Sequence, residues 1–436
     1  MKQTEFVLWK CHDLLRGVFD KTYAMKLTKE FIFLKLLNDE LSKGVGAWTS
    51  NIQGSFDLKG VTTNEELIES LTIFIHKNKD FHWLNDCLTD LKRVENRVLF
   101  SNVMQLLNET SFTQNAVDVF TICLIQDRES FITPPSLCQL IKQLLASTEY
   151  KNVYNPTIGV GLLTYEVGKN HTDVSIYGQE IQHDALNLCR MLLTLAGRIE
   201  ELSELKEGNV LTDPKHLEDG KLKTFDCVVC HPPFGLRDWG IEQVMEDERF
   251  HRGLPPRAHA DYAFITQVVE SMNKRGKAVM LVPTSVLFRE GRESEIRKQL
   301  IEENLIESII AFPGNMLNGT AIPVNLVIFN RQKESNEILF IDATKFTTRQ
   351  RTLSTLTDQA IKEIVKLYQK RESREEISHV ASLEEIEQNR YNLKVDRYVK
   401  PIIVQETFDL ETLHSEYEAL TQKMITIQKN LKKKLL

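Results

Sequence analysis

The first third of the chain carries hydrophobic residues at helical spacing. Between residues 8 and 43, positions that fit one helix face are occupied by Leu8, Leu15, Leu27, Phe31, Leu34 and Leu37. The stretch GVGAWTSNIQGSFDLKG that follows is rich in Gly, Ser and Asn and predicts a loop. We expect residues 1–125 to form a helical domain.

From about residue 150 the pattern changes to short apolar runs that alternate with helical segments. The runs are NVYNP, VSIYGQE, FDCVVC, KAVMLVP, LIESIIAFP, PVNLVIF and EILFID. Strands separated by helices predict an α/β fold, here a Rossmann-like, mostly parallel sheet over residues 126–345 with an extension over 346–405. Ligands of such sheets bind outside the carboxyl ends of the strands, so the residues after each run are the candidates for a site.

The last segment, residues 406–436, has a different pattern. Its apolar residues alternate spacings of four and three over about three heptads, at Leu413, Tyr417, Leu420, Met424, Ile427 and Leu431. Such a helix either packs on its own chain or pairs with a helix of a partner. We favour the partner, because the segment is terminal and ends in the lysine-rich KNLKKKLL.

Length and composition are those of an ordinary globular protein. The chain has 436 residues, 42% hydrophobic and 26% charged, which allows two or three units with a sizeable core. No run approaches the roughly 18 apolar residues that a membrane helix needs, and the charged N-terminus lacks a signal-peptide core. Seven scattered cysteines favour reduced thiols. We therefore expect a cytoplasmic protein without a membrane anchor.

Cysteine spacing and net charge limit the possible chemistry. Cys227 and Cys230 form a C-x-x-C, but residues three apart in a strand face opposite sides of the sheet, which favours core packing. No second Cys or His pair has ligand spacing, so no metal site is expected. The net charge of −7 argues against a chain that coats nucleic acid by itself, but allows basic loops or a partner that carries the nucleic acid.

Two predicted strands end in residues that suit a nucleoside cofactor. The first leads into Gly159-Val160-Gly161, and a Gly-x-Gly turn before a helix lets the backbone approach a ligand, although plain structural turns also use it. The second ends at Glu180, 19 positions after Gly161, where a carboxylate suits ribose hydroxyls or caps the next helix. The two features together favour cofactor binding.

The third predicted strand, FDCVVC, stops at His231-Pro232-Pro233-Phe234. Prolines end the strand ladder and fix the backbone. A polar group and an aromatic ring are thus presented rigidly at the rim of the sheet. This suits a flat base that stacks on the ring and is hydrogen-bonded at its edge, although the tetrapeptide alone also fits a simple turn with a core Phe.

In this order the segments resemble the modification subunit of type I restriction systems, an adenine-N6 DNA methyltransferase. The resemblance runs through LWKCHDLLRGVFDKTYAMKLTKEFIFLKLLNDEL, ESFITPPSL, NPTIGVGLL, YGQE, RGLPPRAHADYAFITQVVESM, VMLVPTSVLFREGRESEIRKQLIEEN, AFPGNMLNGTAIPVNLVIFN, ILFIDATK and YNLKVDRYV. It implies S-adenosyl-L-methionine as the cofactor and methyl transfer to an adenine that is rotated out of the DNA duplex.

The resemblance also implies roles and partners. It places four residues at the target base, His231, Pro232, Pro233 and Phe234. It places seven at the cofactor, Phe131, Thr133, Asn155, Gly159, Gly161, Glu180 and Asn209. The implied partners are double-stranded DNA, a specificity subunit bound through the C-terminal helix, a second modification subunit and, in some systems, a motor-nuclease subunit.

Several positions depart from the family pattern. The family usually has Asn or Asp at His231, Asp at Asn155 and Asp at Asn209. A neutral imidazole can still accept a hydrogen bond from an amine, and an unperturbed pKa of about 6.5 favours the neutral form. Two hypotheses follow, an active methyltransferase and a catalytically silent subunit with a structural or DNA-binding role. A methyltransferase for RNA or a glutamine side chain is a third, because similar turns serve amide nitrogens.

A basic loop follows the third predicted strand. Around Pro255-Pro256 it carries Arg249, His251, Arg252, Arg257 and His259. This composition is equally consistent with contacts to DNA phosphates and with an ordinary solvated loop.

Overall fold

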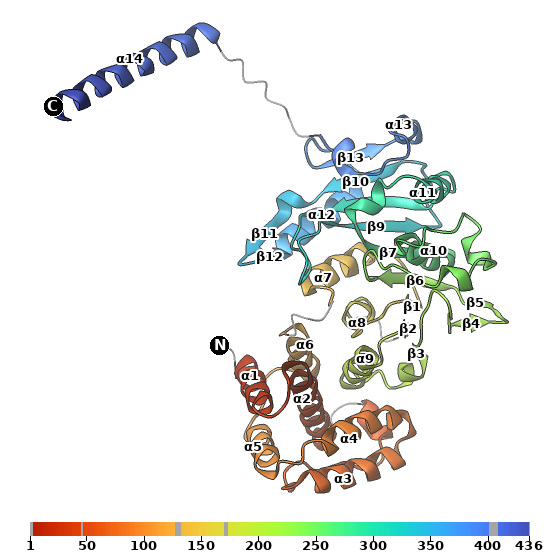
Figure 1. Cartoon of the computed structure of the whole chain (residues 1–436). Helices are drawn as coiled ribbons and strands as arrows, with labels where there is room; N and C mark the ends of the chain where they lie inside the picture. The colour runs from red at the N-terminus through yellow and green to blue at the C-terminus, as the bar shows by residue number, and fades with distance from the viewer. Residues whose placement is uncertain (1–2, 45–46, 127–131, 170–172, 401–408, 436) are drawn as a thin grey trace. The chain divides into compact units, whose positions relative to one another are not determined.

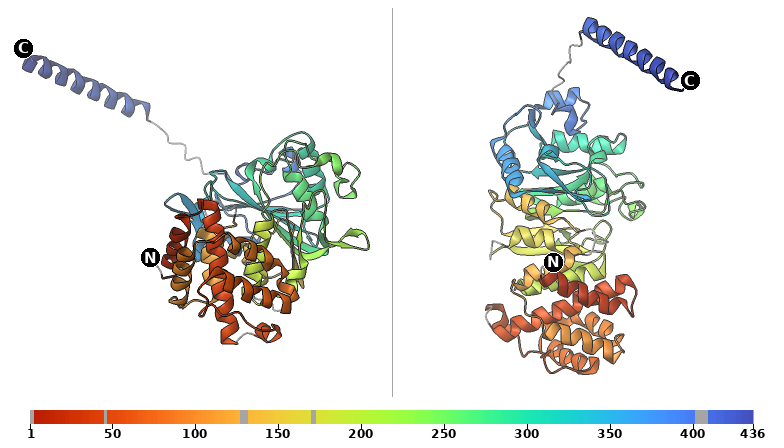
Figure 2. Two further views of the ribbon diagram at one scale, coloured as in Figure 1. Left: turned by 60° about the horizontal axis from the view of Figure 1, so that its bottom comes forward. Right: turned by 90° about the vertical axis from the view of Figure 1, so that its left-hand side faces the viewer.

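The computed structural model describes residues 3–44, 47–126, 132–169, 173–400 and 409–435. The chain divides into two units, Met1–Val399 and Lys400–Leu436. The first unit contains a helical part and a large sheet, and the second contains the terminal helix α14 (Figure 1). Figure 2 shows the helical part of the first unit in red to orange.

Six α-helices occupy the described residues up to 126. They are α1 (Gln3–Arg16), α2 (Lys21–Lys43), α3 (Asn64–Lys77), α4 (Asn85–Lys92), α5 (Arg97–Asn108) and α6 (Ala116–Gln126), with 3-10 turns at Ala47–Asn51 and Lys79–Leu84. Asp20 caps α2 by accepting a hydrogen bond from the Tyr23 N–H, and Thr63 and Glu66 form a capping box that starts α3. Helix α2 is buried on nearly all sides between residues 27 and 38, so the other helices pack around it.

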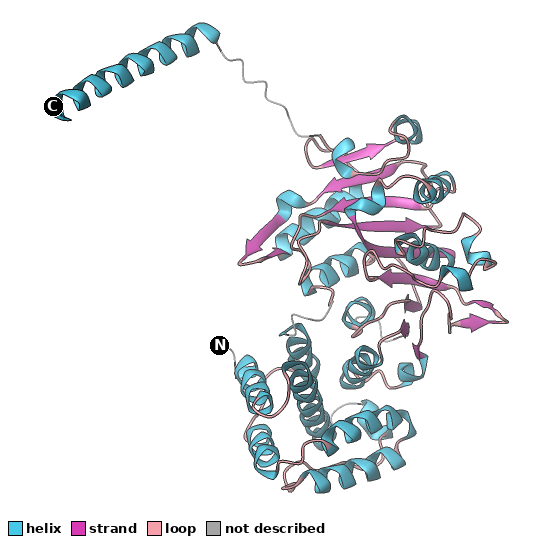
Figure 3. Cartoon of the chain, viewed as in Figure 1, coloured by secondary structure: helices cyan, strands magenta, loops and turns pink. Residues whose placement is uncertain are grey.

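A nine-stranded sheet, magenta in Figure 3, forms the rest of the first unit. Its order is β13-β10-β8-β9-β7-β6-β1-β2-β3. Strands β9 and β13 are antiparallel to their neighbours and the other pairs are parallel, which confirms the predicted fold class. The bounds are β1 Asn152–Asn155, β2 Ser175–Glu180, β3 Leu205–Glu207, β6 Phe225–Cys230, β7 Met272–Pro283, β8 Ile306–Ala311, β9 Val324–Asn330, β10 Ile338–Asp342 and β13 Ser378–Ala381.

Helices cover both faces of the sheet. One face packs against α7 (Pro135–Leu144), α8 (Leu162–Gly168) and α12 (Asp358–Lys370), and helix α9 (His183–Leu195) packs near β2. The other face packs against α10 (Asp261–Glu270), α11 (Arg292–Glu302) and α13 (Leu383–Gln388). Each face therefore buries its own set of apolar strand residues, as expected of a sheet that is covered on both sides.

The C-x-x-C pair lies in strand β6 and points to both of these cores. Cys227 packs on the α7 side and Cys230 on the α10 side, and both are fully buried with free thiols. Burial raises the pKa of both thiols, to about 12 for Cys230. The interpretation as core packing is confirmed.

The remaining elements are short. Two hairpins, β4–β5 (Leu217–Glu218 and Lys221–Leu222) and β11–β12 (Thr347–Gln350 and Leu353–Leu356), project from the sheet. Further 3-10 turns span Glu200–Glu204, Ile241–Gln243, Glu248–Phe250, Thr284–Leu287, Thr344–Phe346 and Val395–Arg397.

The second unit is one helix, α14 (Leu410–Leu435), which the heptad pattern predicted. Among the residues that the structure describes, no helix is both long and apolar enough to cross a bilayer. Over the same residues, no group of three or more His, Cys, Asp or Glu side chains is arranged to hold a metal ion.

Candidate functional site

The carboxyl ends of four parallel strands, β3, β2, β1 and β6, lie next to one another. Asn155 at the end of β1 pairs in register with Gly178 of β2, and Glu180 at the end of β2 pairs with Glu207 of β3. The chain runs outward from β1 to β2 and β3, then returns to β6 on the other side of β1. A reversal of this kind opens a crevice at the carboxyl edge, where open α/β sheets bind their ligands.

The turn after β1 is built by the side chain of Asn155. Its Oδ1 accepts from the Thr157 N–H at 3.0 Å, and its Nδ2 donates to Thr164 Oγ1 in helix α8 at 3.0 Å. Asn155 is buried, so its amide is used within the protein to hold the turn. Gly159 and Gly161 follow in the left-handed region, with φ of 55° and 82°.

The two glycines of this turn have different surroundings. A Cβ at Gly161 would lie 2.5 Å from Cys189 Sγ, so Gly161 lets the turn pack against helix α9. A Cβ at Gly159 would meet no atom within 4 Å. Gly159 therefore leaves open space in front of the backbone, as a turn that receives a ligand requires.

Glu180 connects the end of β2 to this turn. Its Oε2 accepts from the Gly159 N–H at 2.9 Å, and its Oε1 accepts from the Gln182 N–H at 2.9 Å. Each carboxylate oxygen keeps a further lone pair for a ligand hydroxyl. Asn209 follows β3, and its Oδ1 accepts from the Leu211 N–H at 3.0 Å.

His231 and Phe234 follow strand β6, with Pro232 and Pro233 between them. The two ring centroids are 5.6 Å apart, with 45° between the ring planes. His231 Nδ1 lies 2.9 Å from Thr133 Oγ1. Burial lowers the pKa of His231 to about 4, so its ring is neutral near pH 7.

The loop that carries Phe234 is tied to helix α10. The Gly235 N–H donates to Asp261 Oδ1 at 3.2 Å, and Asp261 is itself almost fully buried. Arg289 donates to Asp261 Oδ2 at 2.7 Å and to Glu293 at 3.0 Å. This network holds the loop by charge-assisted hydrogen bonds in addition to its prolines.

Seven of the eleven site residues predicted from the sequence line one cavity of about 1250 Å³. These are Gly159, Glu180, Asn209, His231, Pro232, Pro233 and Phe234. Thr133, Asn155 and Gly161 lie directly behind that wall, where they support His231, the turn and helix α9. Phe131 lies outside the described residues.

The helical part of the chain forms the opposite wall, which sequence reasoning missed. Side chains of α2, of α4 and of the residue after α4 line the same cavity, among them Tyr23, Lys26, Glu30, Asp90 and Arg93. The available signal was the presence of charged residues within the nearly all-buried stretch of α2, because a charge in such a place needs a partner.

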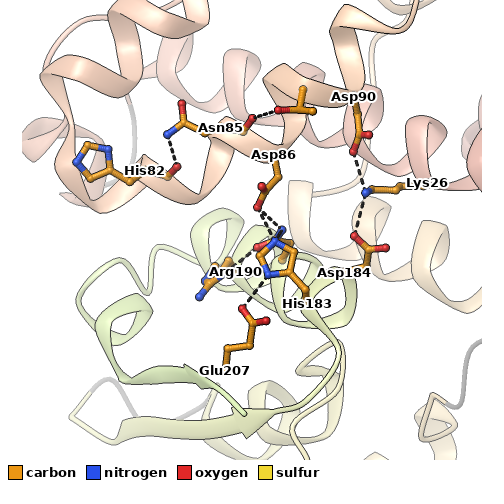
Figure 4. Close-up of polar contacts among 11 residues, drawn as sticks. Lys26, His82, Asn85, Asp86, Asp90, His183, Asp184, Arg190 and Glu207 are labelled. Carbon is orange, nitrogen blue, oxygen red and sulfur yellow. Dashed lines mark hydrogen bonds and ion pairs between the residues drawn. The ribbon is translucent and has the colours of Figure 1, made fainter.

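Polar contacts of Lys26 and Asp86 join the helical part to helix α9 (Figure 4). Lys26 Nζ lies 2.8 Å from Asp90 Oδ2 and 2.9 Å from Asp184 Oδ1 of α9. His183 lies between Glu207 and Asp86, at 2.8 and 2.7 Å, and hydrogen bonds to these two carboxylates raise its pKa. These contacts connect the two walls of the cavity.

The basic loop is not a set of free cations. Arg249 is buried and bonded to Asp247, to Gln267 and to the carbonyls of Val210 and Leu211. Arg252 is buried between Glu270 and Glu303, at 2.6 Å from each. For these two arginines both expectations, a phosphate contact and a solvated loop, are therefore wrong, because both guanidinium groups are buried and paired within the protein.

Comparison with known proteins gives a consistent result. The N-6 DNA methylase family model matches residues 124–407. Over 382 residues, 78% of the chain, the sequence is 28% identical to the type I restriction enzyme MjaVII methylase subunit of Methanocaldococcus jannaschii. It is 30% identical to the HindI methylase subunit of Haemophilus influenzae over 62% of the chain. The chain spans 65% and 63% of the lengths of these two relatives, less than two thirds.

The fold is also known from crystallography. The type I restriction-modification system methyltransferase subunit of Streptococcus thermophilus superposes with a TM-score of 0.82, at 22% identity. The match covers 92% of this chain and 99% of that one, which shows a shared fold. Since the family model covers well over half of the sequence, the chain belongs to the N-6 DNA methylase family.

Proposed function

We propose that this chain is the modification subunit of a type I restriction-modification-like complex, which transfers a methyl group from S-adenosylmethionine to the N6 amine of adenine in DNA. The observation that carries this proposal is the convergence of Gly159, Glu180 and Phe234 on one cavity at the carboxyl edge of the sheet. Similarity to proteins named as type I methylase subunits supports it.

The residues present fit the cofactor. The open space before Gly159 can receive the part of the cofactor that carries the sulfonium. The spare lone pairs of the Glu180 carboxylate suit the vicinal hydroxyls of the ribose. Asn209 lies beside them in the same cavity, where it suits the adenine ring. Thr133, Asn155 and Gly161 support this proposed binding region from behind the cavity wall, and the resemblance adds Phe131 to it. When bound, S-adenosylmethionine would supply an electrophilic methyl group, which would pass from its sulfonium to the amine lone pair, with S-adenosylhomocysteine left behind and one amine proton lost to solvent.

The base-binding side of the cavity uses the rigid loop after β6. Phe234 offers a ring face for stacking, and a flipped base gains such stacking when it leaves the duplex. Neutral His231 can accept a hydrogen bond from the amine, which orients the amine for transfer. Pro232 and Pro233 hold these two groups in place.

The test is a methylation map. The chain is co-expressed with a type I specificity subunit in a host that lacks adenine methylation, and long-read sequencing then reports modified adenines. We expect one methylated motif, and we expect its loss in His231→Ala but not in His76→Ala, which changes an exposed histidine of α3 that does not line the cavity. Absence of modified adenine with the native chain would contradict the proposal. If methylation appeared only after His231→Asn, Asn155→Asp and Asn209→Asp were combined, the silent alternative would be the correct one.

We further propose that α14 binds the specificity subunit through a helix–helix contact. Its heptad side chains Leu413, Tyr417, Leu420, Met424, Ile427 and Leu431 are between 43% and 69% exposed. An apolar stripe of this kind is stable in water only when a partner helix covers it. A second modification subunit, double-stranded DNA and a motor-nuclease subunit are the further proposed members of the complex.

A further inference from the structure

His231 is held from behind by one residue that lies 98 positions earlier in the chain. Its Nδ1 is 2.9 Å from the hydroxyl of Thr133, and Thr133 is buried. Among the described residues, Thr133 is the hydrogen-bond partner of the His231 ring. The other ring nitrogen, Nε2, is left for the cavity that His231 lines.

Both partners of this contact are fixed by their backbones. The sequence reads Thr133-Pro134-Pro135 in one segment and His231-Pro232-Pro233 in the other. A residue before proline is restricted to extended backbone conformations, which limits the directions in which the Cα–Cβ bonds of the two partners can point. Thr133 is also tied to helix α7, because the Cys138 thiol donates to the Thr133 carbonyl at 3.4 Å.

A neutral imidazole carries its single proton on one nitrogen, and the choice decides what the ring offers to the cavity. With the proton on Nδ1, the ring donates to Thr133 Oγ1 and presents the Nε2 lone pair. With the proton on Nε2, Nδ1 accepts from the Thr133 hydroxyl instead, and the ring presents a donor to the cavity. An amine that must keep its own lone pair for methyl transfer needs an acceptor, since a donor would compete for that lone pair.

Since the target amine needs an acceptor, we infer that Thr133 is a positioning residue whose hydroxyl accepts the Nδ1–H of His231 and so leaves Nε2 as a hydrogen-bond acceptor for that amine. This role rests on the proposed function and adds to it, since it gives the unusual histidine the acceptor property that an Asn or Asp oxygen would have. Thr133 acts through the ring and does not itself need to touch the base.

The test reads the tautomer directly by 15N nuclear magnetic resonance of protein labelled in histidine. The His231 signals are assigned by their loss in His231→Asn. In the native chain at pH 7 we expect a protonated Nδ1 and an unprotonated Nε2. Thr133→Val should move the proton to Nε2 in a large share of the molecules, whereas Thr133→Ser, which keeps the hydroxyl, should restore the native pattern. Melting curves identify any variant that fails to fold.

The catalytic readout is the methylation rate at saturating S-adenosylmethionine in the complex with a specificity subunit. Thr133→Val should lower kcat by about tenfold, in line with the loss of one buried hydrogen bond, and Thr133→Ser should recover most of it. The inference is overturned if the native chain carries its His231 proton on Nε2, or if Thr133→Val keeps the proton on Nδ1, even when methylation occurs. Complete absence of methylation refutes the proposed function, while the spectra still decide the role of Thr133.

Discussion

The replacement of Gly161 by alanine tests the geometry of the cofactor turn. Gly161 has a φ of 82°, and its added Cβ would lie 2.5 Å from Cys189 Sγ and 3.4 Å from Cys189 Cβ. The left-handed backbone costs an alanine about 1 kcal/mol, and forcing a methyl group into the contact with α9 costs about 1–3 kcal/mol more. We therefore expect Gly161→Ala to lower the free energy of unfolding by about 2–4 kcal/mol.

Gly159→Ala is the matched control. Gly159 has a φ of 55°, but its Cβ would meet nothing within 4 Å, so only the backbone cost of about 1 kcal/mol applies. This variant should instead weaken S-adenosylmethionine binding, because the new methyl group occupies the open space before the turn. Thermal melting and isothermal titration of both variants separate the two effects.

Cys189→Ala gives the decisive cross-check. Removing the thiol relieves the contact at Gly161, so the double variant Gly161→Ala with Cys189→Ala should lose less stability than the two single variants added together. A coupling of about 1 kcal/mol is expected for groups in direct contact. Strictly additive losses, or equal losses for Gly159→Ala and Gly161→Ala, would show that the turn does not pack against α9 as described.

Three further predictions concern charge and assembly. The pKa of His231 is lowered from about 6.5 in the unfolded chain to about 4 in the folded protein. The free energy of unfolding should therefore fall as the pH drops from 6.5 to 4, by at most about 1.4 kcal/mol per pH unit. Melting curves of His231→Asn should show a smaller fall over the same pH range. Lys26→Met removes the cation between Asp90 and Asp184 and should lower the free energy of unfolding by about 2–3 kcal/mol in melting experiments. The control Lys43→Met, at the more exposed pair with Glu40, should lower it by less than about 0.5 kcal/mol. Equal losses in the two variants would contradict the role of Lys26 as a bridge. Leu420→Asp should weaken the binding of a specificity subunit by about tenfold, whereas Gln422→Asp, on another face of α14, should leave it unchanged. Equal binding by both variants would refute the heptad contact.

Local pattern sufficed for most of the sheet. All seven apolar runs form strands, because each supplies enough apolar residues to be buried on both faces of the mostly parallel sheet. Strand β3 (Leu205–Glu207) has only three residues and carries no periodic signal, so the sequence did not reveal it. Strand β13 (Ser378–Ala381) has four residues and lies at the sheet edge.

The site was predictable where function follows from strand ends, and not where it depends on distant partners. Gly159, Glu180 and His231 each follow a recognisable strand, so their convergence could be expected. The contribution of α2 to the cavity and the internal pairing of Arg249 arise from tertiary contacts between segments far apart in the chain. The charged residues of α2 indicate that partners are needed, but a single sequence does not say which distant segments supply them.

The most direct measurement of the central claim is equilibrium titration of the full chain with S-adenosylmethionine. Glu180→Gln should weaken binding by about tenfold or more, because a carboxylate that accepts ligand hydroxyls is lost. Glu207→Gln, at the neighbouring strand end in register with Glu180, should leave the affinity within about twofold of the native value, since Glu207 pairs with His183 and does not line the cavity. The account predicts that the native chain binds S-adenosylmethionine and that only Glu180→Gln weakens this binding. No binding by the native chain, or an equal loss of affinity in both variants, would contradict the proposal that the cofactor binds in this cavity.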